Sequence, residues 1–218
     1  MQMRLMNAIV VSLFLALGGQ TARCQGFFNL DFEQPITPLN PVNFEVATSN
    51  ALPAWTAYAY GNPQSSIVYN TVSLGAAAVS LQGPGSLEPI LQGSYTVILQ
   101  GSSGGPPGSA AIGQIGQIPL SAESLVFWGY VGLDNVSFDG YTLPLVQIGS
   151  TAHYNIYGAD ISPFAGRTGE LLFTAPSSYM ELVDNIQFSS QAIPEPGIYA
   201  LSAFGALLLG WRVLARRR

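Results

Sequence analysis

Short stretches in which apolar and polar residues alternate run through the middle of the chain. From Phe27 to Glu33, apolar Phe28, Leu30 and Phe32 alternate with polar residues, a period of two that predicts a strand with one buried face. Alternation or β-branched and aromatic runs predict further strands over Ala54–Tyr60, Ser66–Asn70, Ala76–Leu81, Tyr95–Gln100, Ala111–Ile118, Ser124–Val131, Val136–Phe138, Tyr141–Leu145, His153–Tyr157, Glu170–Thr174 and Met180–Phe188.

Turn-forming residues separate these segments. Asp139-Gly140 between two apolar runs is typical of a tight hairpin, and the Gly- and Pro-rich stretch from Gly101 to Gly108 predicts a loop. No segment of the middle region has the pattern of a long amphipathic helix. The pattern therefore predicts an all-β domain over residues 25–193, built as a jelly-roll-like sandwich of two antiparallel sheets.

The first 24 residues have the three parts of a secretory signal peptide. Arg4 provides a basic start, an apolar run follows from Ala8 to Leu17, and a short polar stretch ends at Ala22-Arg23-Cys24. Small residues at the positions before the cut favour cleavage after Cys24, and cleavage after Ala22 is the alternative. Because Cys24 is the single cysteine, the mature domain contains no disulfide.

The C-terminal segment, residues 194–218, has three features in a fixed order. Pro194-Glu195-Pro196 comes first, the charge-free run Ile198–Trp211 follows, and Arg212, Arg216, Arg217 and Arg218 close the chain. The run lacks a polar face, which favours a membrane helix over an amphipathic core helix. Its length of about 21 Å is marginal for a hydrocarbon core of about 30 Å. The arginines predict a positive stop that stays in the cytoplasm, with the preceding domain outside it.

This order of Pro-Glu-Pro, short apolar helix and terminal Arg cluster resembles the PEP-CTERM family of bacterial sorting signals. The resemblance covers only the C-terminal segment. It implies that an exosortase, an integral membrane enzyme, recognises Pro194, Glu195 and Pro196 and processes the protein near them. The expected product is exported, first as an inner-membrane-anchored precursor and then at the cell envelope, at the cell surface or outside the cell.

Charge is distributed very unevenly along the chain. The sequence has no Lys, and six of its seven Arg lie in the two terminal segments. Between Gln25 and Ile193, eleven carboxylates and one Arg give a net charge of −10. This balance excludes nucleic acid as an expected partner, because binding to phosphates needs clustered cations.

Three short motifs of the middle region are similar to galactose-binding-like carbohydrate-binding modules. They are Asn29-Leu30-Asp31-Phe32-Glu33, Pro53-Ala54-Trp55 and Leu182-Val183-Asp184-Asn185-Ile186. The resemblance implies that the first and last strands approach each other and that Glu33 and Asp184 share a structural Ca²⁺. Calcium takes six to eight oxygen ligands, and the sequence identifies only these two residues. The alternative is that both carboxylates face solvent or accept backbone hydrogen bonds.

The sequence offers no catalytic constellation. His153 is the only histidine, and neither a Gly-x-Ser-x-Gly nor a His-Glu-x-x-His motif is present. We therefore expect a non-catalytic surface or matrix protein that binds extracellular polysaccharide or has a structural role, with the ligand-binding residues not identified. The alternative is a carbohydrate-active hydrolase on the same sandwich, because a fold alone does not decide activity.

Overall fold

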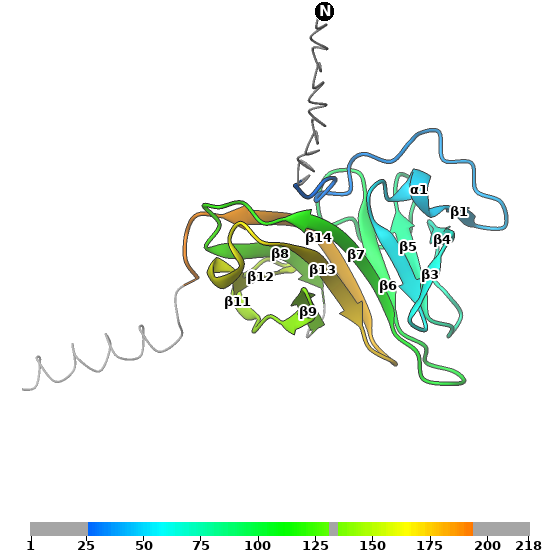
Figure 1. The fold of residues 1–218 in the computed structure, drawn as a ribbon. Coiled ribbons are helices and arrows are strands. Elements are labelled where there is room, and N and C mark those ends of the chain that lie inside the picture. Colours follow the sequence, from blue (N-terminus) through cyan, green and yellow to red (C-terminus); the bar gives the residue numbers. More distant parts are fainter. Residues whose placement is uncertain (1–25, 131–134, 194–218) are drawn as a thin grey trace, which may run out of the picture.

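In the computed structural model, residues 26–130 and 135–193 are described and form two packed sheets (Figure 1). The larger sheet has eight strands in the order β1 (Glu45–Ala47), β4 (Ser66–Tyr69), β5 (Ala78–Gln82), β6 (Thr96–Gln100), β14 (Met180–Ser189), β8 (Ser124–Tyr130), β12 (Asn155–Asp160) and β11 (Val146–Ser150). The smaller sheet has six, in the order β10 (Tyr141–Thr142), β9 (Asn135–Phe138), β13 (Thr168–Ala175), β7 (Ala110–Gln117), β2 (Thr56–Ala59) and β3 (Asn62–Gln64).

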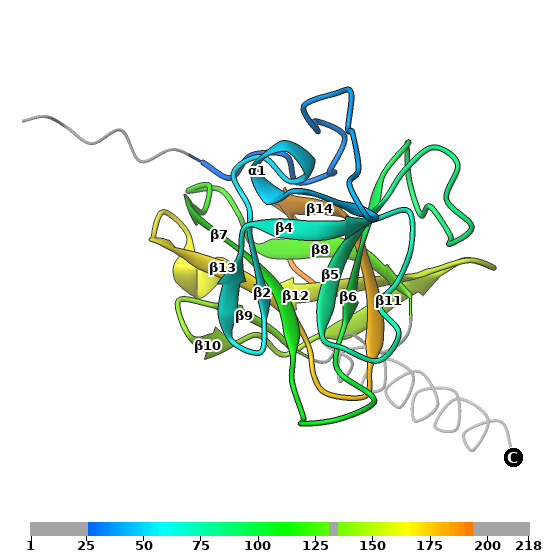
Figure 2. The same cartoon turned by 90° about the vertical axis from the view of Figure 1, so that its right-hand side faces the viewer.

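Neighbouring strands in the described residues pair antiparallel, except β4 and β5, which are parallel. The only helices there are one α-turn, α1 (Thr48–Ala51), and one 3₁₀ turn, η1 (Ser162–Phe164). Figure 2 shows the strands from the side on which β4, β5 and β6 lie. The chain is thus an all-β, two-sheet sandwich in the part described, as the alternation predicts.

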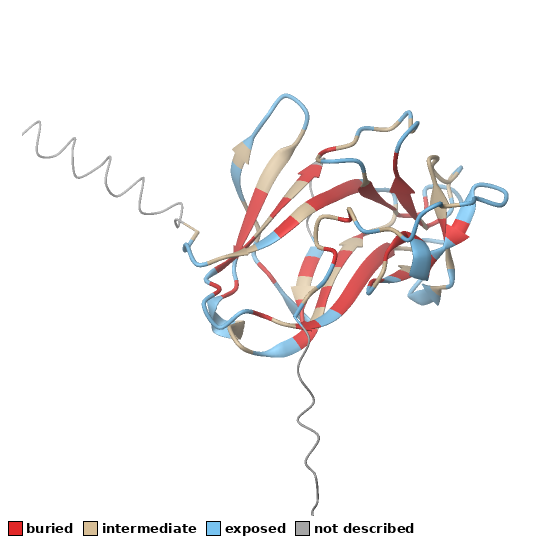
Figure 3. Ribbon diagram, turned by 90° about the horizontal axis from the view of Figure 1, so that it is seen from above, coloured by how far each residue is buried: buried red, intermediate tan, exposed pale blue. Residues whose placement is uncertain are grey.

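The core lies between the two sheets and contains a series of touching aromatic rings. The Phe127 ring from the larger sheet meets the Phe173 ring from the smaller sheet edge-on, with 5.2 Å between centroids. Phe173 also contacts Trp55, and Trp55 contacts Phe32 at 5.5 Å. Phe32, Phe127 and Phe173 are fully buried, and Figure 3 shows the buried stretches concentrated on the strands. Such ring pairs stabilise the fold by more than the apolar area that they bury would predict.

The alternating pattern predicts most strands but fails for the first segment. Phe27–Glu33 is not a strand: Gly26 makes one isolated bridge to Gln117, and the chain then turns. Asn29 and Phe32 have φ values of 52° and 57°, and the Phe32 amide donates to the Asn29 carbonyl. These left-handed residues break the period of two, because a strand needs extended backbone throughout.

A glutamine side chain attaches this first segment to the smaller sheet. Gln114 of β7 accepts a hydrogen bond from the Phe28 amide at 2.6 Å and donates one to the Phe28 carbonyl at 2.9 Å. The side-chain amide therefore takes the place that a neighbouring strand's backbone would have. Gln114 is buried, so these bonds also satisfy polar atoms that have lost water.

The other departures are short elements with weak sequence patterns. Strands β1, β3 and β11 are not predicted, and β12 lies later than expected, over Asn155–Asp160. The hairpin at Asp139-Gly140 is confirmed: both residues have positive φ, 50° and 79°, between the paired strands β9 and β10. A left-handed turn of this kind matches the twist of the two strands.

Candidate functional site

The three motifs of the middle region meet at one end of the sandwich. The Trp55 indole N–H donates to the Asn29 carbonyl at 3.0 Å, which joins the second motif to the first. The Ile186 amide donates to the Leu30 carbonyl at 2.9 Å, which joins the third motif to the first. The first segment is therefore held against the last strand, although it is not itself a strand.

Glu33 of the first motif binds a turn that precedes β6. Its Oε1 atom accepts hydrogen bonds from the backbone amides of Ser94 and Tyr95, at 2.7 and 2.9 Å. The same carboxylate lies against Gly93, where an added Cβ would come within 2.3 Å of Oε1. Gly93 also has a φ of +63°, so both its conformation and its contact favour glycine.

Asp184 of the third motif binds the same turn from the other side. It is fully buried, and its Oδ2 atom accepts hydrogen bonds from the Gln92 amide at 3.0 Å and the Thr96 hydroxyl at 2.6 Å. Its Oδ1 atom accepts a bond from the Asn185 amide at 2.7 Å. Together the two carboxylates hold residues 92–96, which links the first segment, β6 and β14.

Burial raises the pKa of Asp184 from 3.8 to about 7. The hydrogen bonds from Thr96, Asn185 and Gln92 favour the charged form and oppose this shift, and the negative charge of Glu33 adds to it. Both carboxylates therefore act on one turn, and the negative charge of Glu33 disfavours the charged form of Asp184.

These residues partly fit the calcium site expected from the resemblance. Both carboxylates bind the turn of residues 92–96, and the carbonyl oxygen of the Gln92 side chain is buried without a hydrogen-bond partner in the described residues. Calcium favours carboxylate and amide oxygens such as these. Within residues 26–130 and 135–193, however, no three His, Cys, Asp or Glu side chains gather. The shared Ca²⁺ stays a prediction.

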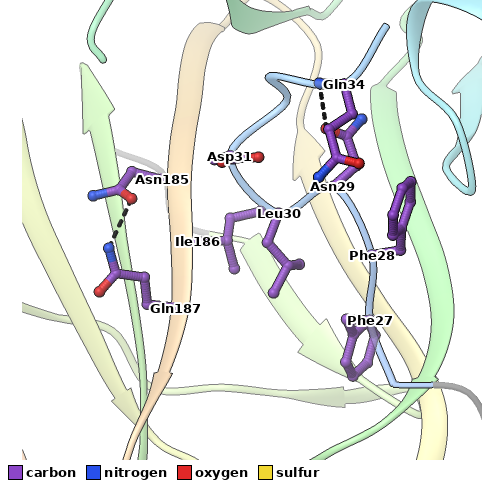
Figure 4. A pocket seen from close by; sticks show the side chains of 9 residues that line it. All are labelled: Phe27, Phe28, Asn29, Leu30, Asp31, Gln34, Asn185, Ile186 and Gln187. Carbon is purple, nitrogen blue, oxygen red and sulfur yellow. Dashed lines mark hydrogen bonds between the residues drawn. The ribbon is translucent and has the colours of Figure 1, made fainter. Parts of the chain in front are cut away.

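A solvent-accessible pocket of about 450 Å³ lies between the first segment and the irregular part of β14 (Figure 4). Its lining comes from residues 27–31, Gln34 and residues 185–187. The pairing of β14 with β8 shifts between Asp184 and Gln187, and Asn185 has a φ of 49°. Figure 4 shows the side chains of Asn185 and Gln187 on one side of this bulged part of β14 and the Ile186 side chain on the other, toward Leu30.

Sequence reasoning does not identify this pocket, although it identifies the motifs on either side. Its lining depends on Gln114 holding Phe28 across 86 positions of sequence and on the bulge in β14. The one usable signal is that both motifs contain Asn, which adopts left-handed backbone more readily than most residues. Asn29 and Asn185 both do so here.

Among the remaining predicted residues, only His153 is described, and it takes no part in this arrangement. His153 is exposed in a turn, where its backbone amide donates to the Thr151 hydroxyl at 3.1 Å. The signal peptide, the sorting residues Pro194, Glu195 and Pro196, and the stop residues Arg212, Arg216, Arg217 and Arg218 lie outside the described residues. Within the described ranges, no helix has the length and hydrophobicity to cross a membrane.

Replacing Gly93 by Ala should destabilise the chain more than replacing Gly85. Both glycines have positive φ, +63° and +87°, so each substitution costs about 1 kcal/mol in backbone strain. Only Gly93 lies against Glu33, whereas nothing lies within 4 Å of a Cβ at Gly85. In urea unfolding, Gly93→Ala should therefore lower the free energy of unfolding by about 1–3 kcal/mol more than Gly85→Ala, because it displaces the Glu33 carboxylate from its hydrogen bonds. Equal losses would show that Glu33 does not fix the turn.

The stability of the metal-free chain should fall as pH rises toward neutrality. The folded pKa of Asp184 is about 7, above the usual 3.8, so the folded state retains a proton that the unfolded state releases. The stabilisation from this retained proton is fully present below about pH 4. Between about pH 4 and pH 7 the free energy of unfolding falls by about 1.4 kcal/mol per pH unit. In urea unfolding with EDTA present, Asp184→Asn should remove most of the dependence of the free energy of unfolding on pH. Asp139→Asn, at an exposed carboxylate, should keep that dependence. The same pH dependence in both variants would show that Asp184 is not its source.

Calcium binding should oppose that trend, because the metal favours charged carboxylates. We expect calcium to raise the melting temperature of the wild-type chain at neutral pH and EDTA to lower it. Glu33→Gln should abolish the response, whereas Glu45→Gln, an exposed carboxylate that binds Ser66, should keep it. A melting temperature unchanged by calcium and by EDTA would reject the calcium site.

No family model matches this sequence, and no curated protein matches it. Among solved structures it is similar to the Stig cyclase Fisc from Fischerella sp. TAU, at 15% identity and a TM-score of 0.40, over 75% of this chain and 94% of that one. An apo cyclase from Fischerella sp. is similar at 17% identity and a TM-score of 0.38, over 75% of this chain and 93% of that one. The enzymatically active domain of bacteriophage CBA120 tailspike protein 4 is similar at 17% identity and a TM-score of 0.36, over 69% of this chain and 21% of that one. At these values the likeness carries no argument about activity.

Proposed function

We propose that the chain is an exported cell-surface or extracellular-matrix protein, and that its sandwich is a non-catalytic module that binds glycans or builds the matrix. Export and sorting rest on the two terminal sequence patterns, the signal peptide and the PEP-CTERM-like segment with its membrane helix. The partners are then an exosortase-type enzyme, the membrane during sorting, and extracellular polysaccharide. Between the termini, the two-sheet sandwich is proposed to be of the jelly-roll type.

One observation carries this proposal: the sandwich fits between the two predicted processing points. Gly26, which pairs with Gln117, directly follows the expected mature terminus at Gln25. The last strand, β14, ends at Ser189, and Pro194 follows shortly after it in sequence. Cleavage near either point would leave each described strand whole.

The charge of the sandwich argues against nucleic acid as a partner. Arg167 is the only cation between Gln25 and Ile193, and it lies 3.5 Å from Asp139, with both side chains about half exposed. The remaining carboxylates face no Lys or Arg of this region. An acidic, weakly charged surface of this kind repels phosphate and favours neutral partners.

The most prominent pair of carboxylates supports a non-catalytic role. Glu33 and Asp184 interact with each other, but their oxygens accept hydrogen bonds from Gln92, Ser94, Tyr95 and Thr96. A catalytic pair must instead present a free carboxyl to the scissile bond and to water. Their role here is to fix a turn.

Replacement of Pro194 and Pro196 by Ala should block sorting in a host that has an exosortase. We expect a longer precursor that stays in the membrane fraction, detected by immunoblotting of fractionated cells. A matched control is Pro106→Ala with Pro107→Ala, two prolines in an exposed loop of the sandwich. Wild-type processing of the Pro194/Pro196 variant would reject the sorting assignment, and turnover of any bound glycan would reject the non-catalytic role.

A further inference from the structure

We infer that the pocket between the first segment and the bulge of β14 binds a neutral carbohydrate. This inference deepens the proposed glycan-binding role and rests on it. The pocket has a volume of about 450 Å³. That is within the range of small-molecule sites, which combine an apolar surface with a few converging polar groups.

Hydrogen bonds within the protein hold both walls of the pocket. The Leu30 carbonyl accepts a bond from the Ile186 amide, and both backbone groups of Phe28 bond to Gln114. The Gln34 amide donates to the Asn29 side-chain oxygen at 3.0 Å. The two walls are therefore fixed in the absence of a ligand, which lowers the entropy cost of binding.

One buried polar atom of the lining has no hydrogen-bond partner. Asn29 is only 3% exposed, and its side-chain nitrogen is unpaired in the described part of the chain. A buried donor left unsatisfied is costly, and such atoms are rare. Asn29 lines the pocket, but this nitrogen is itself buried, so the donors that a ligand can reach directly are on other residues.

A second amide pair at the mouth is positioned for ligand hydroxyls. The Gln187 Nε2 atom donates to the Asn185 Oδ1 atom at 2.7 Å, and Figure 4 shows both side chains from β14 beside the pocket. This bond orients both amides and leaves Asn185 Nδ2 as a donor and Gln187 Oε1 as an acceptor. A sugar hydroxyl both donates and accepts, so it matches this pair.

Phe28 supplies an apolar surface in the same lining, across Leu30 and Ile186 from these two amides (Figure 4). It is 40% exposed although it is aromatic. A sugar ring has C–H groups on one face and hydroxyls around its edge, so a short oligosaccharide that spans the pocket can contact the Phe28 ring and the amides of β14 together. An exposed aromatic ring that shares a pocket with side-chain amides therefore fits a carbohydrate better than it fits a purely apolar ligand.

Charge restricts the ligand to the neutral class. Asp31 is the only charged residue of the lining, and the pocket contains no Lys, Arg or His. An anionic sugar would meet the Asp31 carboxylate with no cation to compensate, which is unfavourable. A neutral sugar would use the same carboxylate as a hydrogen-bond acceptor.

The test is an array of neutral and acidic glycans probed with the full-length chain, followed by isothermal titration calorimetry of the strongest neutral oligosaccharide bound. Phe28→Ala should raise its Kd about tenfold, the value of one aromatic contact. Gln187→Ala should raise it about fivefold, the value of one hydrogen bond. Both side chains are exposed, so both variants should melt at the wild-type temperature.

Matched controls lie elsewhere on the surface. Gln147 also donates to an asparagine oxygen, at 3.2 Å from Asn155, and Phe44 is 68% exposed. Gln147→Ala and Phe44→Ala should therefore leave Kd unchanged. Binding that survives in the Phe28 and Gln187 variants would overturn the pocket while leaving the glycan-binding role intact. No binding to any neutral glycan, with normal sorting in the Pro194/Pro196 assay, would overturn both glycan claims but not export.

Discussion

The contact between aromatic rings across the two sheets is the constraint on which the rest of the structure depends. Phe127 and Phe173 come from different sheets and meet edge to face, and Trp55 extends this contact to Phe32 of the first segment. Because the Trp55 indole also bonds to the Asn29 carbonyl, the packing of the core sets the position of the pocket wall. A single residue thus couples the interior to the surface, since an indole has both an apolar body and one donor.

The site end of the sandwich combines two kinds of polar group that behave differently. Glu33 and Asp184 are engaged by a turn, and burial keeps the pKa of Asp184 near 7. The neighbouring amides of Asn185 and Gln187 carry no charge and keep unused donors or acceptors. Charged groups therefore shape this end of the fold, and neutral groups remain for a ligand. The division follows from desolvation, which is far more costly for a charge than for an amide.

Alternation in the sequence predicts the strands that have one buried face, because their side chains follow the pleat. It predicts most of the large strands, including β7, β13 and β14. It misplaces Phe27–Glu33, where alternation coincides with left-handed backbone at Asn29 and Phe32. Motif resemblance draws attention to Glu33 and Asp184, and both carboxylates bind the turn of residues 92–96. The pocket is not predictable in the same way, because it arises from a bulge and from one buried glutamine, and neither has a period.

The attachment of the first segment through Gln114 has a consequence for how proteins of this architecture diversify. Residues 27–34 form one wall of the pocket but belong to no ladder, so their replacement changes no strand register. In a sheet, by contrast, a one-residue insertion moves each following side chain to the opposite face. Substitution of the exposed Phe28 and Gln34 side chains can therefore change the chemistry of this wall at little risk to the sandwich, whereas Phe32 is fixed by the core and Glu33 by its bonds to the turn. Ligand preference is free to drift while the scaffold stays constant.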